Sequence, residues 1–312
     1  MKKKYLIVAP HYDRRSSGIK ALYVLCSRLN SLGYEAYITG EKSPYPNTKR
    51  VWDLNKEELK DLQLNGVVVY PDHIVNKNPL RFTNVVRWFL GITQEAPENE
   101  LVFSMSPSHN FTVQAKYNLM MLDIEPFFKF PEVENRSHKC FRVGKGSAIY
   151  RSPLTNGCTE ITADFPMSRE GLAYLLQSSK IFYTYDNFTL LMLEALLCGC
   201  PVVILGYPIT EKKNIIGNVL NKYGTRFHEE ISFDDNGIPL NYDEMKSEIP
   251  QQITLYNELM LNAHQELLKF IELTQNMPDV YVEDLGAHTP SNPHPWIAMG
   301  FWNDFFTLFS ER

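Results

Sequence analysis

The sequence lacks the features that mark several common classes of protein. Its five cysteines form no Cys-x-x-Cys pair, which argues against a zinc ribbon and a disulfide framework. Lysine and arginine number 31 against 36 aspartates and glutamates, so nucleic acid is not expected as a main partner. No apolar run approaches the roughly 20 residues of a membrane span, and residues 5–9 are too short a run for an export signal. We therefore expect a cytoplasmic protein that is soluble or, at most, held peripherally at the inner face of a membrane.

Two motifs for binding nucleotides are also absent. There is no Gly-x-Gly-x-x-Gly, which counts against an ordinary dinucleotide site, and no Gly-Lys-Ser or Gly-Lys-Thr of a Walker A loop. The apolar residues, 44% of the chain, are nevertheless enough for a sizeable core, and the length favours two domains.

Short apolar runs alternate with segments of helical periodicity along most of the chain. Residues 5–9 are typical of a parallel strand covered on both faces, and residues 19–32 of a helix that ends at Gly33. The alternation continues at residues 34–39, 66–70, 84–90, 101–104, 169–178, 180–185, 189–197 and 201–205, and an amphipathic helix is expected at 254–273. This order predicts an α/β protein with parallel sheets, which bind ligands at the carboxyl ends of their strands.

The alternation is interrupted by prolines, a charged stretch at 132–139 and the glycines near residue 145. We therefore predict a first α/β domain at 1–135 and a second at 136–285. The remaining segment, 286–312, is rich in aromatic residues and is expected to dock on a neighbouring element.

One charge stands inside the apolar helix expected at 189–197. A buried carboxylate without a partner costs several kcal/mol, so Glu194 should face a ligand, a cation or a hydroxyl-rich surface. The alternative is a glutamate that faces solvent, on an ordinary helix capped by Asp186.

Residues 181–204 resemble the donor-site signature of the GT-B glycosyltransferases. That signature has an acidic residue, seven intervening residues and a glutamate, followed by alanine, glycine and Pro-Val-Val. The matching positions here are Asp186, Glu194, Ala195, Gly199, Pro201, Val202 and Val203. This chain has Asp186 where the family usually has glutamate, and Thr189 where it usually has glycine.

The resemblance implies two Rossmann-like domains that face each other across a cleft, with the acceptor on the first domain and a nucleotide sugar on the second. It implies that Glu194 accepts hydrogen bonds from the ribose and that Asp186 lies near the donor sugar. The N–H groups that open the helix, at Phe188, Thr189 and Leu190, then offer a site for the diphosphate.

Such enzymes often place a basic residue after the first strand of the nucleotide domain. Lys145 is the first candidate and Arg142 the second, with Gly144 allowing close approach of the backbone; the alternative is a solvated loop lysine. In the first domain, Gly18 lies in the loop that the family places beside the phosphates. A glycine is equally expected there as part of an ordinary turn.

Two histidines are candidates for the base that activates the acceptor. His73 and His109 lie at strand ends of the first domain, and imidazole titrates near neutral pH. A structural role is the alternative for each.

The resemblance implies transfer of a sugar from a nucleotide diphosphate donor to a saccharide or lipid-linked acceptor, in the manner of bacterial enzymes of surface-polysaccharide synthesis. The acidic pair favours retention of configuration. No metal or resident cofactor is expected, since the sequence has no Asp-x-Asp triplet. Two alternatives stay open: a sugar-nucleotide epimerase of the same fold, and a protein that binds nucleotide sugars without catalysis.

Overall fold

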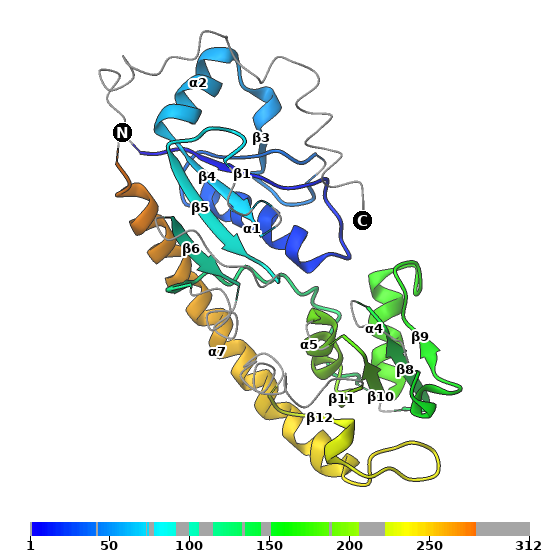
Figure 1. Ribbon diagram of the computed structural model, residues 1–312. Helices are drawn as coiled ribbons and strands as arrows, with labels where there is room; N and C mark the ends of the chain where they lie inside the picture. Colours follow the sequence, from blue (N-terminus) through cyan, green and yellow to red (C-terminus); the bar gives the residue numbers. More distant parts are fainter. Residues whose placement is uncertain are drawn as a thin grey trace. The chain divides into compact units, whose positions relative to one another are not determined.

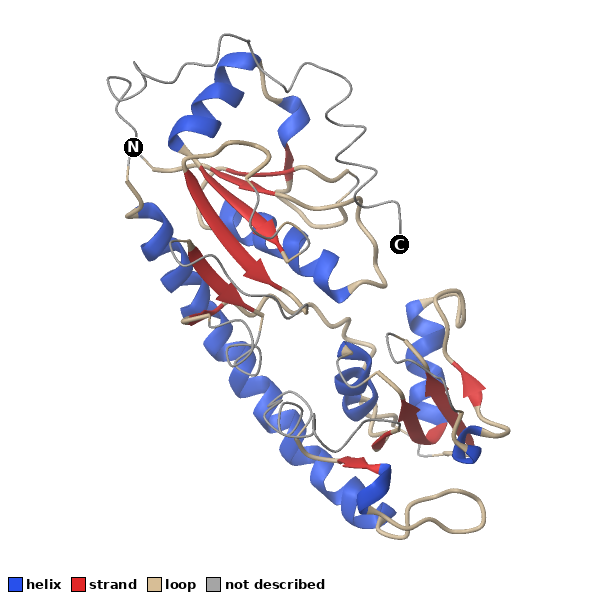
Figure 2. Cartoon of the chain, viewed as in Figure 1, coloured by secondary structure: helices blue, strands red, loops and turns tan. Residues whose placement is uncertain are grey.

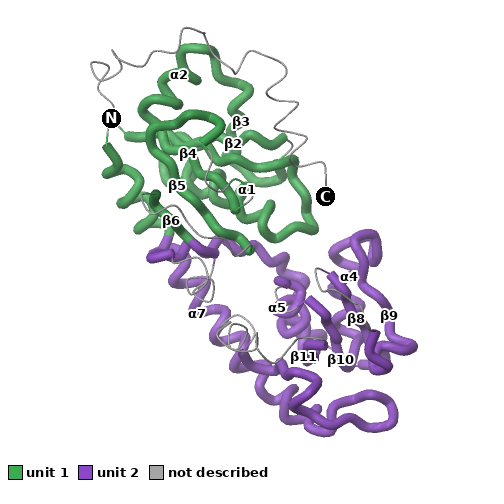
Figure 3. The backbone as a smooth tube through the Cα atoms, in the orientation of Figure 1, with its two compact units in different colours: residues 1–103, 267–312 green, residues 104–266 purple. Residues whose placement is uncertain are grey.

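The computed structural model describes residues 2–41, 43–72, 74, 78–91, 100–105, 115–132, 135–144, 151–186, 189–205 and 222–278. The chain forms two compact units, residues 1–103 with 267–312, and residues 104–266 (Figure 3). Both units combine helices and strands (Figure 2). None of the helices within the described ranges is both long and apolar enough to cross a membrane.

The first unit is built on a largely parallel sheet. Its strands are β1 (Tyr5–Ile7), β2 (Ala36–Ile38), β3 (Lys49–Arg50), β4 (Val67–Pro71), β5 (Asn84–Phe89) and β6 (Leu101–Ser104). The last strand of the sheet, β7 (Tyr117–Asn118), comes from the residues of the second unit. The order is β3-β2-β1-β4-β5-β6-β7, and the neighbouring pairs from β3 to β5 run parallel (Figure 1).

Two helices of the first unit begin at side-chain caps. Helix α1 (Ser17–Ser31) starts where the Ser16 hydroxyl accepts a hydrogen bond from Ile19 N, and it packs against β2. Helix α2 (Lys56–Asn65) starts at a capping box made by Asn55 and Glu58, and it packs against β4. After α1 the chain turns at Gly33, whose φ of +78° favours glycine, as the sequence predicts.

Within its described residues, the second unit holds a parallel sheet of five strands. They are β8 (His138–Arg142), β9 (Thr159–Glu160), β10 (Ser179–Thr184), β11 (Val202–Ile204) and β12 (Thr225–Phe227), in the order β12-β11-β10-β8-β9. Helices α4 (Arg169–Ser178) and α5 (Leu190–Leu197) pack against each other and against this sheet. Short 3-10 turns lie at η1 (Val51–Asp53), η3 (Pro153–Thr155) and η6 (His228–Glu230).

The predicted fold class is confirmed: the chain is α/β, and each unit has a sheet with parallel strands. All five cysteines are free, in agreement with the absence of a disulfide framework. The helix expected at 254–273 is longer than its periodicity indicates, because α7 (Tyr242–Gln275) also includes Pro250 near its start. The predicted segment 286–312 lies outside the described residues.

The boundaries between the two units fall between residues 103 and 104 and between residues 266 and 267. The sequence pattern places the domain boundaries near residues 135 and 285. The reason for the first difference is packing. Phe128 belongs to the hydrophobic core formed by α4, α5 and their sheet, and Phe127 packs against it. The carbonyl of Phe127 also accepts a hydrogen bond from Gln177 on α4. Residues before β8 therefore join the second unit although they form no part of its alternating pattern.

Candidate functional site

The carboxyl ends of β8 and β10 bring three predicted site residues together. Arg142 is the last residue of β8 and pairs in register with Thr184, the last residue of β10. Gly144 and Asp186 each follow their strand by two residues. Ligands of open parallel sheets bind at this edge, which makes it the candidate location of a site.

Gly144 lies directly against Asp186. Its φ is +61°, and a Cβ added to it would lie 2.6 Å from Asp186 Oδ2 and 3.2 Å from Arg142 Nε. No side chain other than hydrogen fits this position without displacing the carboxylate. Glycine therefore allows the backbone, an acidic side chain and a basic side chain to meet at one point.

The backbone of Asp186 is fixed by the strand that precedes it. Asp186 N donates a hydrogen bond of 3.0 Å to Thr184 Oγ1, and that hydroxyl donates one of 2.9 Å to Asp186 O. Tyr185 N donates to Arg142 O at 2.9 Å, which joins the ends of the two strands. Asp186 is buried, with 5% of its surface exposed, so its carboxylate is held rather than free in solvent.

Arg142 carries a buried donor whose acceptor is missing from the described part of the chain. Its Nε is inaccessible to solvent and has no hydrogen-bond partner among those residues. Buried polar groups are nearly always hydrogen-bonded, so this N–H calls for an acceptor. An anionic oxygen at the strand edge would satisfy it.

Helix α5 begins close to this edge and carries Glu194. Thr189 is its N-cap, and the Thr189 hydroxyl accepts a hydrogen bond of 3.3 Å from Leu191 N; Leu190 is the first helical residue. The alternative in which Asp186 caps this helix is therefore wrong. The alternative in which Glu194 faces solvent is also wrong, because only 3% of Glu194 is exposed.

The partner of Glu194 is Arg169, the first residue of α4. Arg169 Nη1 donates to Glu194 Oε2 at 3.2 Å, and Arg169 Nη2 donates to Glu194 Oε1. The same guanidinium donates to Glu125, at 2.9 Å from Nη2 and 3.3 Å from Nε, and lies 4.5 Å from the centre of the Phe128 ring. Of the three environments expected for Glu194, the structure supplies a cation.

The charges of this cluster stabilise one another. Burial by itself lowers the pKa of the Arg169 guanidinium. The attraction and hydrogen bonds of Glu194 and Glu125 outweigh burial, so the pKa is raised and Arg169 stays charged.

Sequence reasoning did not find Arg169 or Glu125. One signal was available, because a basic residue in the first turn of a helix lies at the unfavourable end of the helix dipole. An acidic partner elsewhere in the fold would offset that unfavourable interaction.

Five predicted site residues remain. Lys145, Phe188, His73 and His109 lie outside the described residues, so their roles stay predictions. Gly18 lies inside α1 of the first unit, and a Cβ there would make only ordinary contacts of 3.6 Å with Leu90. Nothing in the packing at that position requires glycine.

Comparisons with known proteins give distant similarities. No protein-family model matches the chain, and no curated protein matches it significantly. A solved glycosyltransferase from Rickettsia africae ESF-5 aligns with 88% of this chain and 98% of its own, at 12% identity and a TM-score of 0.47. WaaG, a glycosyltransferase involved in lipopolysaccharide biosynthesis, aligns with 88% of this chain and 100% of its own, at 10% identity and a TM-score of 0.41.

A third solved structure is an alpha-glucosyltransferase in complex with UDP and a 13-mer DNA. It aligns with 86% of this chain and 95% of its own, at 14% identity and a TM-score of 0.40. Similarities this distant assign neither an activity nor a ligand to the present chain.

Proposed function

We propose that this protein is a glycosyltransferase of GT-B type that moves a sugar from a nucleotide diphosphate donor to a saccharide or lipid-linked acceptor. The reaction needs no metal, retains the configuration of the sugar and serves the synthesis of a surface polysaccharide or other glycan. The observation that carries the proposal is the meeting of Arg142, Gly144 and Asp186 at the carboxyl edge of the second sheet.

The diphosphate of the donor would lie against Arg142. Its buried Nε requires an acceptor, and phosphate oxygens form strong, charge-assisted hydrogen bonds with guanidinium groups. The start of α5, a few residues after Asp186, adds the positive end of a helix dipole at the same edge. Neutralisation of the leaving diphosphate in a closed site is commonly worth roughly 3 kcal/mol for each donor.

The two carboxylates would hold the sugar parts of the donor. Asp186 adjoins Arg142 across Gly144, so a sugar attached to the diphosphate would lie within reach of it. Glu194 would accept hydrogen bonds from the ribose hydroxyls. An ionised carboxylate is an acceptor only, and each of its oxygens has a second lone pair beside the one that faces Arg169.

A binding screen tests the proposal. Thermal-shift assays against UDP, GDP, CMP, dTDP and their sugars should show stabilisation by one base and by its sugar, because a ligand that binds the folded state alone raises the melting temperature. Turnover should then require an acceptor. Formation of an epimer from the donor alone would support the epimerase instead, and binding without turnover across a broad acceptor panel would support a non-catalytic binder.

The Asp186→Asn variant tests whether the active site lies at the carboxyl edge of the second sheet. The substitution keeps the size of the side chain and removes its charge, so we expect turnover to fall by about tenfold or more, with folding largely retained. Asp164→Asn is the matched control, since Asp164 is exposed in the same unit and should leave turnover unchanged. Equal activity of both variants, or no nucleotide bound by the wild type, would refute the proposal.

A further inference from the structure

Arg169 is buried between two carboxylates of the second unit. The side chains of Arg169, Glu194 and Glu125 are 9%, 3% and 14% exposed. They come from α4, from α5 and from the segment before β8, so that tertiary packing brings together charges distant in the sequence.

Ion pairs of this kind are a poor source of stability. The loss of hydration on burial offsets much of the attraction, and apolar replacements of buried pairs are often neutral or stabilising. Stability alone therefore does not explain the Arg169 cluster, formed by Arg169, Glu194 and Glu125. We look instead for a role of the Glu194 carboxylate that Arg169 fixes.

We propose that Arg169 is a positioning residue for the nucleotide, holding the Glu194 carboxylate in one orientation so that it can accept hydrogen bonds from the ribose hydroxyls. This inference rests on the proposed function. Arg169 acts through Glu194 and is not assigned a contact with the nucleotide.

The geometry supports this role. The two terminal nitrogens of Arg169 each donate to a different oxygen of Glu194, an arrangement that fixes the plane of the carboxylate as well as its position. Each carboxylate oxygen has two lone pairs, so one on each oxygen is left to accept a hydroxyl. The donation to Glu125 and the contact with the Phe128 ring hold the guanidinium itself in place.

The experiment compares nucleotides with and without the 2′-hydroxyl. Dissociation constants for UDP and 2′-deoxy-UDP, and for GDP and 2′-deoxy-GDP, are measured by titration calorimetry. We expect the wild type to prefer one ribonucleotide over its deoxy form by about tenfold. In Arg169→Met this preference should fall to near one, with weaker binding of the ribonucleotide.

Arg136→Met is the matched control. Arg136 is similarly buried in the same unit, but it donates to the main-chain carbonyls of Leu176, Ser179 and Cys198. Its loss should lower stability and leave the preference for ribose unchanged. Arg169→Lys is used if Arg169→Met does not fold: it keeps the charge but lacks the two-pronged geometry, and it should still reduce the preference.

The outcomes separate the two proposals. A wild type that binds none of the four nucleotides, and none of CMP, dTDP and their sugars, overturns the proposed function and this inference with it. A wild type that binds a nucleotide without preferring ribose overturns the inference alone. A wild type that prefers ribose, with the same preference in the Arg169 variants, overturns the inference alone. Loss of the preference in Arg136→Met as well would show that it follows general destabilisation, and would also overturn it.

Discussion

Gly199 ends α5 and turns the chain toward β11 with a φ of +72°. A Cβ at this position would lie 2.6 Å from Phe130 Cε1 and 2.7 Å from Arg136 Nη2. The position is therefore restricted in two ways, by its left-handed backbone conformation and by its neighbours. Sequence reasoning predicts the first restriction from the helix end, whereas the second depends on a phenylalanine and an arginine from a distant segment.

Gly199→Ala and Gly157→Ala separate these restrictions. Gly157 has a similar φ of +70° but no atom within 4 Å of an added Cβ, so its substitution should cost only about 1–2 kcal/mol, the usual penalty for a left-handed alanine. Gly199→Ala should cost about 1–3 kcal/mol more, because packed neighbours must shift. Urea denaturation measures both, and equal losses would contradict the packing explanation.

The proposed role of Arg142 leads to a prediction about metal ions. If Arg142, Lys145 and the start of α5 balance the charge of the diphosphate, no divalent cation is needed for that purpose. We expect turnover to be unchanged, within about twofold, after treatment with excess EDTA and dialysis. A loss of about tenfold or more, restored by Mg²⁺ or Mn²⁺, would refute metal independence.

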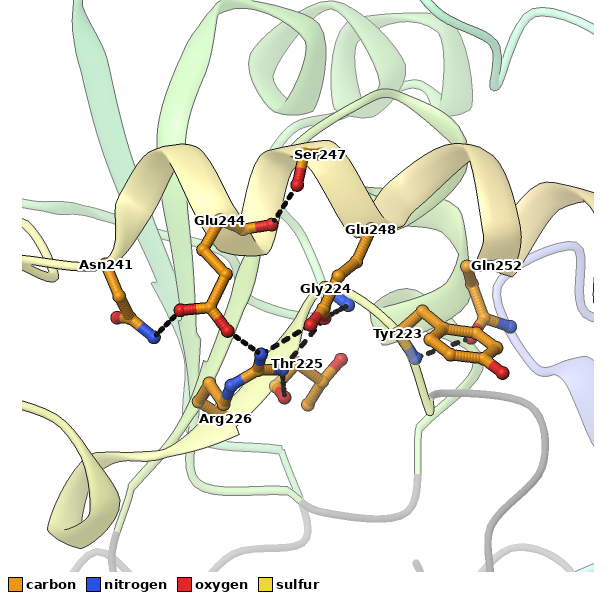
Figure 4. Close-up of polar contacts among 9 residues, drawn as sticks. All are labelled: Tyr223, Gly224, Thr225, Arg226, Asn241, Glu244, Ser247, Glu248 and Gln252. Atoms are coloured by element: carbon orange, nitrogen blue, oxygen red, sulfur yellow. Dashed lines mark hydrogen bonds and ion pairs between the residues drawn. The ribbon is translucent and has the colours of Figure 1, made fainter.

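At the scale of the elements, β12 is joined to the start of α7 by a network of charges (Figure 4). Arg226 donates to Glu248 at 2.6 and 2.9 Å and to Glu244 at 3.2 Å. Glu248 also accepts a hydrogen bond of 2.9 Å from Gly224 N. These bonds fix the edge strand of the second sheet to the helix that follows it.

The network makes stability depend on pH. Hydrogen bonds from Arg226 lower the pKa of Glu248 below its ordinary value, in spite of partial burial. A lowered pKa in the folded state means that Glu248 stabilises the fold above the ordinary glutamate value, and that the contribution is lost as the pH falls through the lowered pKa. Glu248→Gln should therefore cost about 1–2 kcal/mol at pH 7 and much less in strong acid.

Glu272→Gln is the control for this prediction, because Glu272 lies on the same helix in an exposed pair with Lys269. Its effect should stay within about 0.5 kcal/mol. Urea denaturation at pH 7 and at pH 3 measures both variants. A cost for Glu248→Gln that does not change with pH would show that the lost charge is not its cause.

At the scale of the whole molecule, the chain leaves the first unit and returns to it. Residues 267–275 of α7 belong to that unit, where Phe270 is fully buried between Phe103 and Tyr5, with ring centres 5.1 and 5.8 Å away. Gln275 Nε2 donates a hydrogen bond to the Tyr5 hydroxyl, and this hydroxyl shares another with the Thr274 hydroxyl. The end of α7 thus completes the core beside β1.

Phe270→Ala tests this contribution. Loss of a fully buried phenylalanine should cost about 3–5 kcal/mol through lost burial and the remaining cavity. Leu268→Ala is the control, since Leu268 is 41% exposed on the same turn of the helix, and its cost should be below about 1 kcal/mol. Urea denaturation distinguishes the two, and similar values would mean that this end of α7 does not contribute to the core.

The sequence by itself determined the order of elements and the edge at which to look for a site. Helix α4 has the predicted bounds, and α5 and β11 lie within the predicted segments, because periodicity, caps and terminal glycines act over a few residues. It also determined that Glu194 needs a partner, since a lone charge in an apolar helix is costly wherever it lies.

Only the tertiary structure decided which groups meet. The pairing of Glu194 with Arg169, the contact of Gly144 with Asp186 and the return of α7 to the first unit each join segments far apart in the chain. Such contacts depend on how whole elements pack and on the shapes of their side chains. Local patterns carry no record of that packing, so neither the cation beside Glu194 nor the unit boundaries could be derived from them.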